Sequence, residues 1–478
     1  IPKADLEKIK EQEEKTREEL SKEVEAKEDE NIAEGKLEID DPIEIKKESN
    51  LIINNPKKLE GSINIPGDKS ITHRAIMLGG LSDGTITITN SLLSEDCMRT
   101  LVAFRELGVD IQINGEKIVI VGKGIQGLTQ PKSQIDAGNS GTMARLLSGI
   151  LSTQSFDSTI SGDESLVTRP MKRIIEPLES FGALIKSSYG KLPMSFEPPT
   201  SMKPIVYHSK IPSAQVKSSL ILAALNIKGE SIISEDIITR DHTERLLSYL
   251  EYPFVNDKGV ITLQGYKNLV AKDIEIPSDI SSAAFFIVAA LIKEGSDITL
   301  NNIGVNPLRT GIIDVLLEMG GNIKLVNCRT VCNEPVADIR VKHSKLNPVN
   351  ISGKIISRLI DELPILFIAC ATCNGLSLIE DVGELRYKES DRIEAMEHGL
   401  RELGINIVST ENSLSITGGE FIGGIIDSYG DHRIVMSFLI AGLVSLKPIT
   451  VLNTSNIDTS FPGFADILID QKIDLYSI

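Results

Sequence analysis

The sequence contains no tryptophan, and only 4% of its 478 residues are aromatic. Proteins that bind single-stranded nucleic acid stack bases on aromatic side chains, so this composition disfavours that function. The pI near 5.0 also disfavours nucleic acid as a partner, because nucleic-acid-binding proteins normally carry a basic surface. No apolar run reaches about 18 residues without a charge or a breaker, so we expect no transmembrane helix and no membrane partner.

Cysteine is also scarce, and the odd count of 5 favours a reducing compartment. We expect the cytoplasm, with a plastid stroma as the alternative. The spacings of Cys328 with Cys332 and of Cys370 with Cys373 permit a zinc site as an alternative. The second pair lies in an apolar helix-like run, where thiols usually belong to the core, and the first lies in an expected hairpin. We therefore expect no metal.

The first 50 residues hold 18 acidic and 10 basic side chains, which is nearly half of the net charge of −17. Apolar residues are sparse there, so residues 1–47 are expected to be an acidic extension, either disordered or a marginal helix. A coiled coil that binds a partner is the alternative. The extension lacks a secretory signal and is too acidic for a transit peptide. Because the chain begins with Ile1, we expect a processed product or a fragment.

A repeated pattern runs through the rest of the chain: a helix end, a glycine, a strand, a polar turn and a second strand. The five copies are residues 104–122, 178–196, 247–265, 316–334 and 400–418, and a truncated sixth is expected at Ile467–Tyr476. The glycine position suits a left-handed helix C-cap, and one copy has Glu251 there. Repeats of this size predict an α/β fold built from similar α+β units. A generic parallel doubly wound sheet is the alternative, but helix–hairpin repeats do not follow its alternation.

The segment Gly67–Ser70, followed by Arg74, brings a lysine, a hydroxyl and an arginine together directly after an expected strand. It lacks the spacing of a Walker loop but can hold a phosphate or carboxylate. Segments of similar character recur at Asn139–Arg145, Gly162–Met171, Arg386–Arg392 and Asp431–Arg433. Because the chain as a whole is acidic, these positive charges indicate a small, highly anionic ligand.

Several of these segments open expected helices. Gly141 follows Ser140 at one such start, and free N–H groups there suit an anion, although plain N-capping by Ser140 explains the sequence equally well. Ser213 has the same two interpretations. His242 is expected to be structural. Asp361 either complements a helix dipole or acts as a general base.

Taken together, the segments resemble the 5-enolpyruvylshikimate-3-phosphate synthase family of enolpyruvyl transferases, and within it the class II branch. The resemblance covers roughly residues 60–478 and rests on nine strings in family order: GDKSITHR, GNSGTMAR, GDESLVTRPM, PSAQVKSS, TRDHTE, IDELPIL, LRYKESDR, DHRIVMSF and TSFPGF. It implies two domains, each an inside-out α/β barrel of three βαβαββ repeats. One domain would be residues 68–277, and the other would combine 48–67 with 278–478, with hinges at Ile65–Asp68 and Pro277–Asp279.

The resemblance implies transfer of the enolpyruvyl group of phosphoenolpyruvate to the 5-hydroxyl of shikimate 3-phosphate, with release of phosphate and no metal or organic cofactor. Asp361, Glu389 and Lys69 would be catalytic, with Asp361 accepting the hydroxyl proton and Glu389 exchanging a proton with the methylene carbon. Shikimate 3-phosphate would bind to Lys69, Ser70, Arg74, Ser213, Ala214, Gln215, Arg240, Asp361 and Lys388. Phosphoenolpyruvate would bind to Lys69, Gly141, Arg169, Gln215, Arg392 and Arg433. Both partners are small molecules, and a monomer is implied.

The chain departs from the family pattern at a few positions. Thr459 and Ser460 stand where many class I members have a lysine, and Leu308 stands where class II members commonly have threonine. Gly141 stands where the best-known glyphosate-tolerant members have alanine, so we expect stronger inhibition by glyphosate than in those members. The rival activities are UDP-N-acetylglucosamine enolpyruvyl transfer, disfavoured by Lys69-Ser70, and a non-catalytic scaffold.

Overall fold

The computed structural model describes residues 50–54, 57–115 and 117–477. The acidic extension expected over residues 1–47 lies outside them. The described part contains six four-stranded sheets and two hydrophobic cores. We call the elements around the core of Ile71–Ile276 the central lobe, and those around the core that joins Ile53–Ile65 to Ile280–Ile473 the terminal lobe. No described helix is long and apolar enough to cross a membrane.

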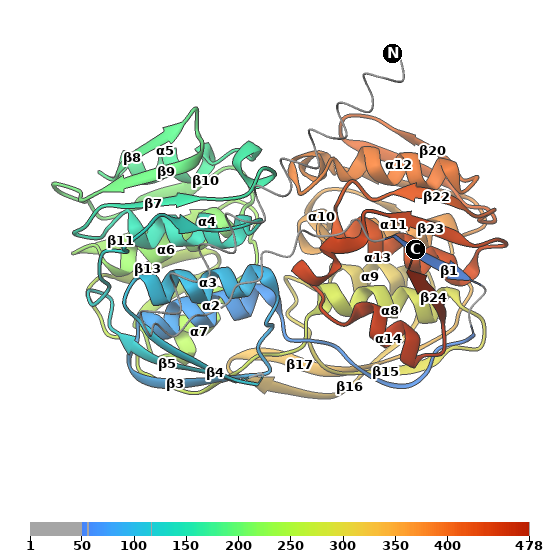
Figure 1. Cartoon of the computed structure of the whole chain (residues 1–478), viewed down its shortest axis with the longest axis horizontal. Coiled ribbons are helices and arrows are strands. Elements are labelled where there is room, and N and C mark those ends of the chain that lie inside the picture. The colour runs from blue at the N-terminus through green and yellow to red at the C-terminus, as the bar shows by residue number, and fades with distance from the viewer. Residues whose placement is uncertain (1–49, 55–56, 116, 478) are drawn as a thin grey trace, which may run out of the picture. The chain divides into compact units, whose positions relative to one another are not determined.

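The middle unit of the central lobe shows the repeat plainly (Figure 1). It consists of β6 (Ile135–Asp136), α4 (Gly141–Leu151), β7 (Ser158–Ser161), α5 (Lys172–Ser180), β8 (Leu184–Ser188) and β9 (Lys191–Glu197). The short leading strand β6 pairs in parallel with β7, and β9 pairs antiparallel with both β7 and β8. The expected βαβαββ repeat is thus present. Its mixture of parallel and antiparallel pairs rules out the parallel doubly wound alternative for the described residues.

The other two units of the central lobe follow the same order. One contains α2 (Lys69–Gly80), β3 (Asp83–Thr89), α3 (Glu95–Glu106), β4 (Asp110–Asn114) and β5 (Lys117–Lys123), and its leading strand is β14 (Ile274–Glu275). The other contains β10 (Val206–Ser209), α6 (Ala214–Leu225), β11 (Glu230–Glu235), α7 (His242–Tyr249), β12 (Phe254–Asp257) and β13 (Val260–Gln264).

The terminal lobe repeats the arrangement. Its first unit contains β2 (Glu60–Asn64), α8 (Ile280–Ile292), β15 (Asp297–Gly304), α9 (Gly311–Glu318), β16 (Asn322–Val331) and β17 (Glu334–Lys342). Its second contains β18 (Asn350–Ile351), α10 (Lys354–Leu359), α11 (Leu363–Ala371), β19 (Leu376–Glu380), the 3₁₀ helix η3 (Gly383–Tyr387), α12 (Arg392–Glu402), β20 (Asn406–Ser409) and β21 (Ser413–Thr417). Its third contains β22 (Gly424–Asp427), α13 (His432–Ala441), β23 (Ile449–Leu452), α14 (Phe464–Asp470), β24 (Asp474–Ser477) and β1 (Leu51–Asn54).

The chain exchanges leading strands where it passes between the lobes. β2 belongs to a sheet of the terminal lobe, although α2 follows it in the central lobe, and β14 makes the converse exchange. The two passages lie side by side, because the Asp68 backbone N–H donates to the Pro277 carbonyl at 2.8 Å and the Asp279 N–H donates to the Pro66 carbonyl at 3.0 Å. The truncated sixth repeat is completed in the same manner, since β24 pairs with β1 from the other end of the chain.

Each hairpin follows a helix that ends in a left-handed residue, as the repeat predicted. The glycines at 108, 182, 320 and 404 have φ between 86° and 108°. Glu251 takes the same conformation with φ 58°, and Lys472 does so in the sixth copy with φ 59°. A side chain other than glycine is strained there, so the backbone geometry of the repeat is kept even where the glycine is lost.

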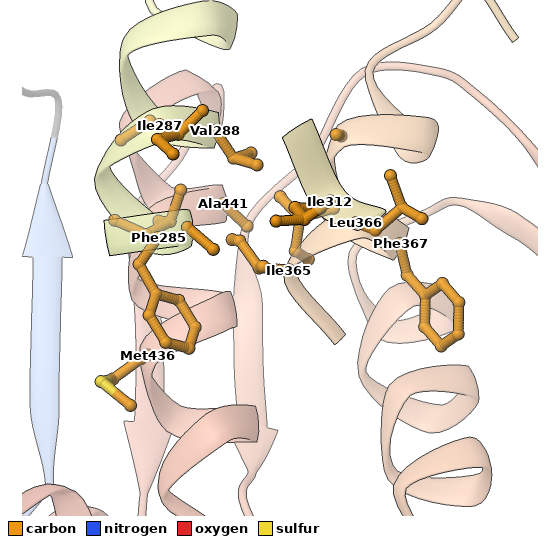
Figure 2. Packing of buried hydrophobic residues seen from close by; sticks show 14 of the residues in the cluster. Phe285, Ile287, Val288, Ile312, Ile365, Leu366, Phe367, Met436 and Ala441 are labelled. Carbon is orange, nitrogen blue, oxygen red and sulfur yellow. The ribbon is translucent and has the colours of Figure 1, made fainter. Parts of the chain in front are cut away.

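In both lobes the sheets lie outside a set of nearly fully buried helices, which are α2, α4 and α6 in the central lobe and α8, α11 and α13 in the terminal lobe. This is the expected inside-out arrangement. All nine residues of α11 are buried, and so are all ten of α13. Figure 2 shows α8 contributing Phe285 and Val288 to this packing beside Ile365 of α11 and Met436 of α13. A helix that is apolar on every side can only be stable in such a position. The buried helices are therefore fixed in direction, and their ends become available as a site.

Candidate active site

The amino-terminal ends of the buried helices meet around one cavity of about 760 Å³. The first residues of α2, α4, α6, α12 and α13 line it, and so do Asp279 and Ser281 at the start of α8. Of its described lining residues, twelve are lysine or arginine and six are aspartate or glutamate. Helix N-termini present free N–H groups and the positive end of the helix dipole, so they reinforce the side-chain charge. The excess of positive charge therefore suits an anion, the kind of ligand that the sequence predicts.

Lys69 is the first residue of α2, which Asp68 caps by accepting a hydrogen bond from the Ile71 N–H at 2.8 Å. The cap turns the lysine toward the cavity, where its Nζ lies 3.0 Å from Asp96 Oδ2. Burial lowers the pKa of Lys69, but the carboxylates of Asp96 and Glu389 outweigh burial and raise it above its usual value. Lys69 is therefore a cation at neutral pH.

Asp361 precedes α11 and lies among cations from both lobes. Its Oδ2 accepts a hydrogen bond from Arg240 Nη2 at 2.5 Å, and its Oδ1 accepts one from Lys388 Nζ at 3.1 Å. Arg392 Nη1 is 3.9 Å away. Burial raises the pKa of this carboxyl, but Lys388, Arg240, Arg433 and Arg392 outweigh burial and hold it well below its usual value. Asp361 is thus ionised and is shared between the central and terminal lobes.

Glu389 lies beside Arg392, whose Nη2 donates to Glu389 Oε2 at 2.6 Å and whose Nε donates to Asp431 Oδ2 at 2.8 Å. Arg169 of the central lobe is 4.0 Å from the other Glu389 oxygen. Burial raises the pKa of Glu389, but Arg392 and Arg169 lead the cations that hold it well below the usual range. Asp361 and Glu389 are therefore two ionised carboxylates held among cations in one cavity.

The spacing of Lys388 and Arg392 would put both on one face if the segment were helical, but Lys388 lies outside the helix. Lys388 is in extended conformation, and α12 begins only at Arg392, because Asp391 caps it by accepting from the Ile393 and Glu394 N–H groups, both at 3.1 Å. Both cations nevertheless approach Asp361, because the chain turns at the cap.

Gly141 opens α4, with Ser140 as its N-cap, so the capping interpretation is correct and the N-terminus still faces the cavity. A β-carbon at Gly141 would lie 2.9 Å from Arg145 Nη1 and 3.4 Å from Arg169 Nη1. Two guanidinium groups therefore approach the space above this glycine. Arg145 Nη1 also donates to Gln215 Oε1 at 3.0 Å, which holds Gln215 against the same wall.

The remaining predicted residues also line the cavity, with different surroundings. Ser213 caps α6 by accepting from the Val216 N–H at 3.4 Å, and Ala214 follows it. Arg74 lines the cavity but donates to the Ser70 carbonyl, Ser218 Oγ and Thr243 Oγ1 at 2.8–2.9 Å, so its hydrogen-bonding groups serve the protein. The Arg433 guanidinium makes no hydrogen bond or ion pair with any residue that the structure describes, which leaves it available to a ligand.

Sequence reasoning missed several lining residues. Asp96 lies in the first turn of α3, and nothing local connects it with Lys69, 27 residues away. Arg145 ends the positively charged segment Asn139–Arg145, but the sequence predicted no role for its side chain. Arg173 of the central lobe donates to both oxygens of Glu384 of the terminal lobe at 2.9 Å, which forms a bidentate bridge at the cavity.

The cysteines have the surroundings that their sequence context suggested. Cys370 and Cys373 are buried in the terminal-lobe core, and burial raises the pKa of the Cys370 thiol to about 12. Cys328 is exposed, and Cys332 lies at the turn between β16 and β17. No cluster of three or more His, Cys, Asp or Glu side chains suited to a metal occurs among the described residues.

The fold matches solved structures over most of its length. The enolpyruvyl transferase NikO from Streptomyces tendae covers 90% of this chain and 99% of its own, with a TM-score of 0.75 and 15% identity. At that identity the match shows the fold alone, and the fold is that of an enolpyruvyl transferase. The EPSP synthase from Acinetobacter baumannii is 42% identical with a TM-score of 0.81, and the match covers 90% of this chain and 100% of the other.

The sequence relatives show which family within the enolpyruvyl transferases the chain belongs to. The family model of EPSP synthase (3-phosphoshikimate 1-carboxyvinyltransferase) matches residues 53–468. The 3-phosphoshikimate 1-carboxyvinyltransferases of Citrifermentans bemidjiense and Legionella pneumophila are each 46% identical over 422 residues, which are 88% of this chain and 98% of theirs. The chain belongs to the EPSP synthase family. The family predicted from the nine strings is thereby confirmed.

Proposed function

We propose that this chain transfers the enolpyruvyl group of phosphoenolpyruvate to the 5-hydroxyl of shikimate 3-phosphate and releases phosphate. The observation that carries the proposal is the cavity in which cations surround two ionised carboxylates. The two substrates together bring two phosphates and two carboxylates, and only a site with an excess of fixed positive charge can hold them side by side. The names of the family model and of the close relatives support the same reaction.

The donor, phosphoenolpyruvate, is assigned to the wall where cations approach Gly141. Arg169, Arg392, Arg433 and Lys69 supply its charge partners, and Gly141 and Gln215 add contacts. The acceptor is assigned to the side of Asp361: Ser213, Ala214 and Gln215 offer the N-terminus of α6, while Lys69, Ser70, Arg74, Arg240 and Lys388 supply further contacts. Arg74 acts mainly by holding the Ser70 backbone, since its own nitrogens already donate within the protein.

Asp361 is the proposed base for the acceptor hydroxyl. In the free protein its cations keep its pKa low, which makes it a weak base. When the anionic acceptor binds, it competes for Lys388 and Arg240, and their attraction for Asp361 declines. The pKa of Asp361 therefore rises toward a value at which it can accept the proton, while the hydroxyl oxygen forms its bond to C2 of the donor.

Glu389 is the proposed acid at the donor C3. The donor phosphate and carboxylate neutralise Arg392, Arg169 and Lys69, so the same competition raises the pKa of Glu389 and lets it carry a proton. The C2–C3 π pair takes that proton as the acceptor oxygen adds to C2. In the second half of the reaction the Glu389 carboxylate removes a proton from the C3 methyl group. The C2–C3 double bond then re-forms and phosphate leaves from C2. Fixed charges and substrate proximity supply most of the barrier reduction.

We further propose that the domains are residues 68–277 and residues 48–67 with 278–478, that closure between them excludes water, and that the protein acts as a monomer in the cytoplasm. The side-by-side chain passages at 66–68 and 277–279 support the division, and five cysteines without a disulfide support a reducing compartment. A partner for residues 1–47 stays a hypothesis that a pull-down with and without this segment tests.

The test is phosphate release from the purified protein with phosphoenolpyruvate and shikimate 3-phosphate, supplied separately and together. Release that requires both substrates supports the proposal. Release with UDP-N-acetylglucosamine in place of shikimate 3-phosphate would assign the other enolpyruvyl transfer, and no release with either acceptor would favour a scaffold. Glyphosate, added to the active mixture, should inhibit, because Gly141 leaves the donor wall open.

A further inference from the structure

Lys217, Glu235 and Glu244 form a buried charged cluster in the central lobe, and the proposed reaction gives none of them a task. Lys217 Nζ lies 2.8 Å from a Glu235 oxygen and 2.8 Å from a Glu244 oxygen. At most 4% of each side chain is exposed. Burial lowers the pKa of Lys217, but the two carboxylates outweigh it and raise the pKa, so the lysine stays charged.

Such a cluster is poorly explained by stability alone. Removing several charges from water costs free energy that their attraction only partly returns, and apolar replacements of buried ion clusters are often neutral or stabilising. A buried cluster is more readily explained if its geometry holds something else in place. The remaining hydrogen bonds of the cluster show what it holds.

Those bonds meet at Thr239, in the loop between β11 and α7. Lys217 Nζ donates to the Thr239 carbonyl at 3.1 Å. The Thr239 N–H donates to Glu235 Oε1 at 2.8 Å, and its hydroxyl donates to Glu235 Oε2 at 2.7 Å. All three polar groups of this residue are thus held by the cluster, and its backbone position is fixed by charged partners, which make stronger hydrogen bonds than neutral ones.

The next residue is Arg240, so the position of its side chain in the cavity depends on the Thr239 backbone. Thr239 and Arg240 both line the cavity, and Arg240 Nη2 donates to Asp361 Oδ2 across the lobes at 2.5 Å. Arginine has a long side chain whose reach depends on where its backbone starts. A loop that moved by about 1 Å would break this bond or change its angle, and misplacements of that size can cost about a hundredfold in rate or binding.

We propose that Lys217 and Glu235 are positioning residues of the acceptor site: they hold Thr239 so that Arg240 meets Asp361 and the acceptor. The inference rests on the proposed function, because Arg240 is assigned to shikimate 3-phosphate there. It adds Lys217 and Glu235, which do not line the cavity, to the residues on which acceptor binding depends. The backbone of Thr239 connects them with the acceptor site.

Steady-state kinetics of Lys217→Met test it. Methionine keeps much of the side-chain volume but cannot hold the Thr239 carbonyl, so the KM for shikimate 3-phosphate should rise by about tenfold or more. The KM for phosphoenolpyruvate should change by less than about threefold, since no side chain assigned to it is hydrogen-bonded to Lys217, Glu235 or Thr239. Glu235→Gln keeps the size and loses the charge, and it should raise the same acceptor KM. This variant decides the question if Lys217→Met does not fold.

The matched control is Leu222→Ala, which shortens a buried apolar side chain of the same helix α6 and leaves the three charged side chains in place. It should lower the melting temperature and leave the acceptor KM unchanged. The decisive measurement is the double variant Lys217→Met/Arg240→Ala. If Lys217 acts through Arg240, the double variant has the acceptor KM of Arg240→Ala alone, because there is nothing left to position.

The outcomes separate the two proposals. A parent protein that releases no phosphate with both substrates overturns the proposed function. An active parent whose acceptor KM is unchanged in Lys217→Met and Glu235→Gln overturns the inference, even if both variants melt earlier. The inference is also overturned if the KM effects of Lys217→Met and Arg240→Ala multiply in the double variant.

Discussion

His73 offers a direct test of the electrostatics around α2, the helix that carries Lys69. Its ring is fully buried, Nδ1 lies 2.7 Å from Thr100 Oγ1, and Nε2 has no hydrogen-bond partner among the described residues. Burial, followed by the charges of Lys69 and Arg74, lowers the pKa of His73 from 6.5 to about 3. The ring is therefore neutral in the folded protein at every pH at which the enzyme is expected to work.

The sign of the pH effect follows from proton counting. Below its ordinary pKa the unfolded chain protonates this histidine and the folded chain does not, so the unfolded state binds more protons and the free energy of unfolding falls as the pH falls. Between the pKa values of His73 in the folded and unfolded chain, each fall of one pH unit lowers the free energy of unfolding by about 1.4 kcal/mol. From about pH 7.5 to about pH 5.0 the total decrease is about 2 kcal/mol.

The assay is urea unfolding of the parent and of His73→Asn across this pH range. Asparagine keeps a polar atom near Thr100 and has no proton to gain, so the difference in unfolding free energy between the two proteins should shrink by about 2 kcal/mol as the pH falls. Taking the difference is necessary, because Asp279, whose pKa burial raises to about 6, opposes the trend in both proteins. His208→Asn, at an exposed position, is the control. Parallel pH profiles of parent and His73→Asn would refute the argument.

Three further predictions concern the site. Asp361→Asn should reduce kcat by about 100- to 10,000-fold, as expected for the loss of a general base, and a kcat within threefold of the parent in phosphate-release assays would exclude that role. Gly141→Ala should fold with a melting temperature close to that of the parent, because the new methyl meets only the ends of side chains, Arg145 Nη1 at 2.9 Å, Arg169 Nη1 at 3.4 Å and Leu166 Cδ1 at 3.6 Å. The KM for phosphoenolpyruvate and the glyphosate inhibition constant should each rise by about tenfold; unchanged constants would show that the space above Gly141 is not the donor wall. Asp96→Asn should lower the pKa of Lys69, because the Asp96 carboxylate is the first of the charges that raise it. The alkaline limb of the kcat/KM profile should therefore move to lower pH; an unmoved limb would show that Lys69 does not set it.

The helix starts at the site could be predicted because capping is local. Ser213 accepts from a backbone N–H three residues ahead, and Ser140 does the same, so a short window of sequence contains the whole interaction. The left-handed residue at each helix end has the same local origin, which is why the repeat was visible at Gly108 and even at Glu251.

The contacts between distant segments could not be predicted in this way. Arg240 meets Asp361 across 121 residues, and Lys217 holds a loop 22 residues ahead of it. Lys388 and Arg392 have the spacing of neighbours on one helical face, but they do not share a helix, because the Asp391 cap starts the helix four residues after Lys388. Periodicity alone does not show where a segment turns, although the cap residue was present in the sequence.

The sequence by itself determined the repeated unit, the buried helices, the family and the segments that supply the charged side chains, because each depends on spacing or capping within a few tens of residues. Only the tertiary structure decided which charges meet. The leading strands β2 and β14 are exchanged between lobes, and the buried helices aim their N-termini at one cavity. There the pKa of Asp361 depends on cations of both lobes, whose distances from it are set by the packing of cores far apart in the chain.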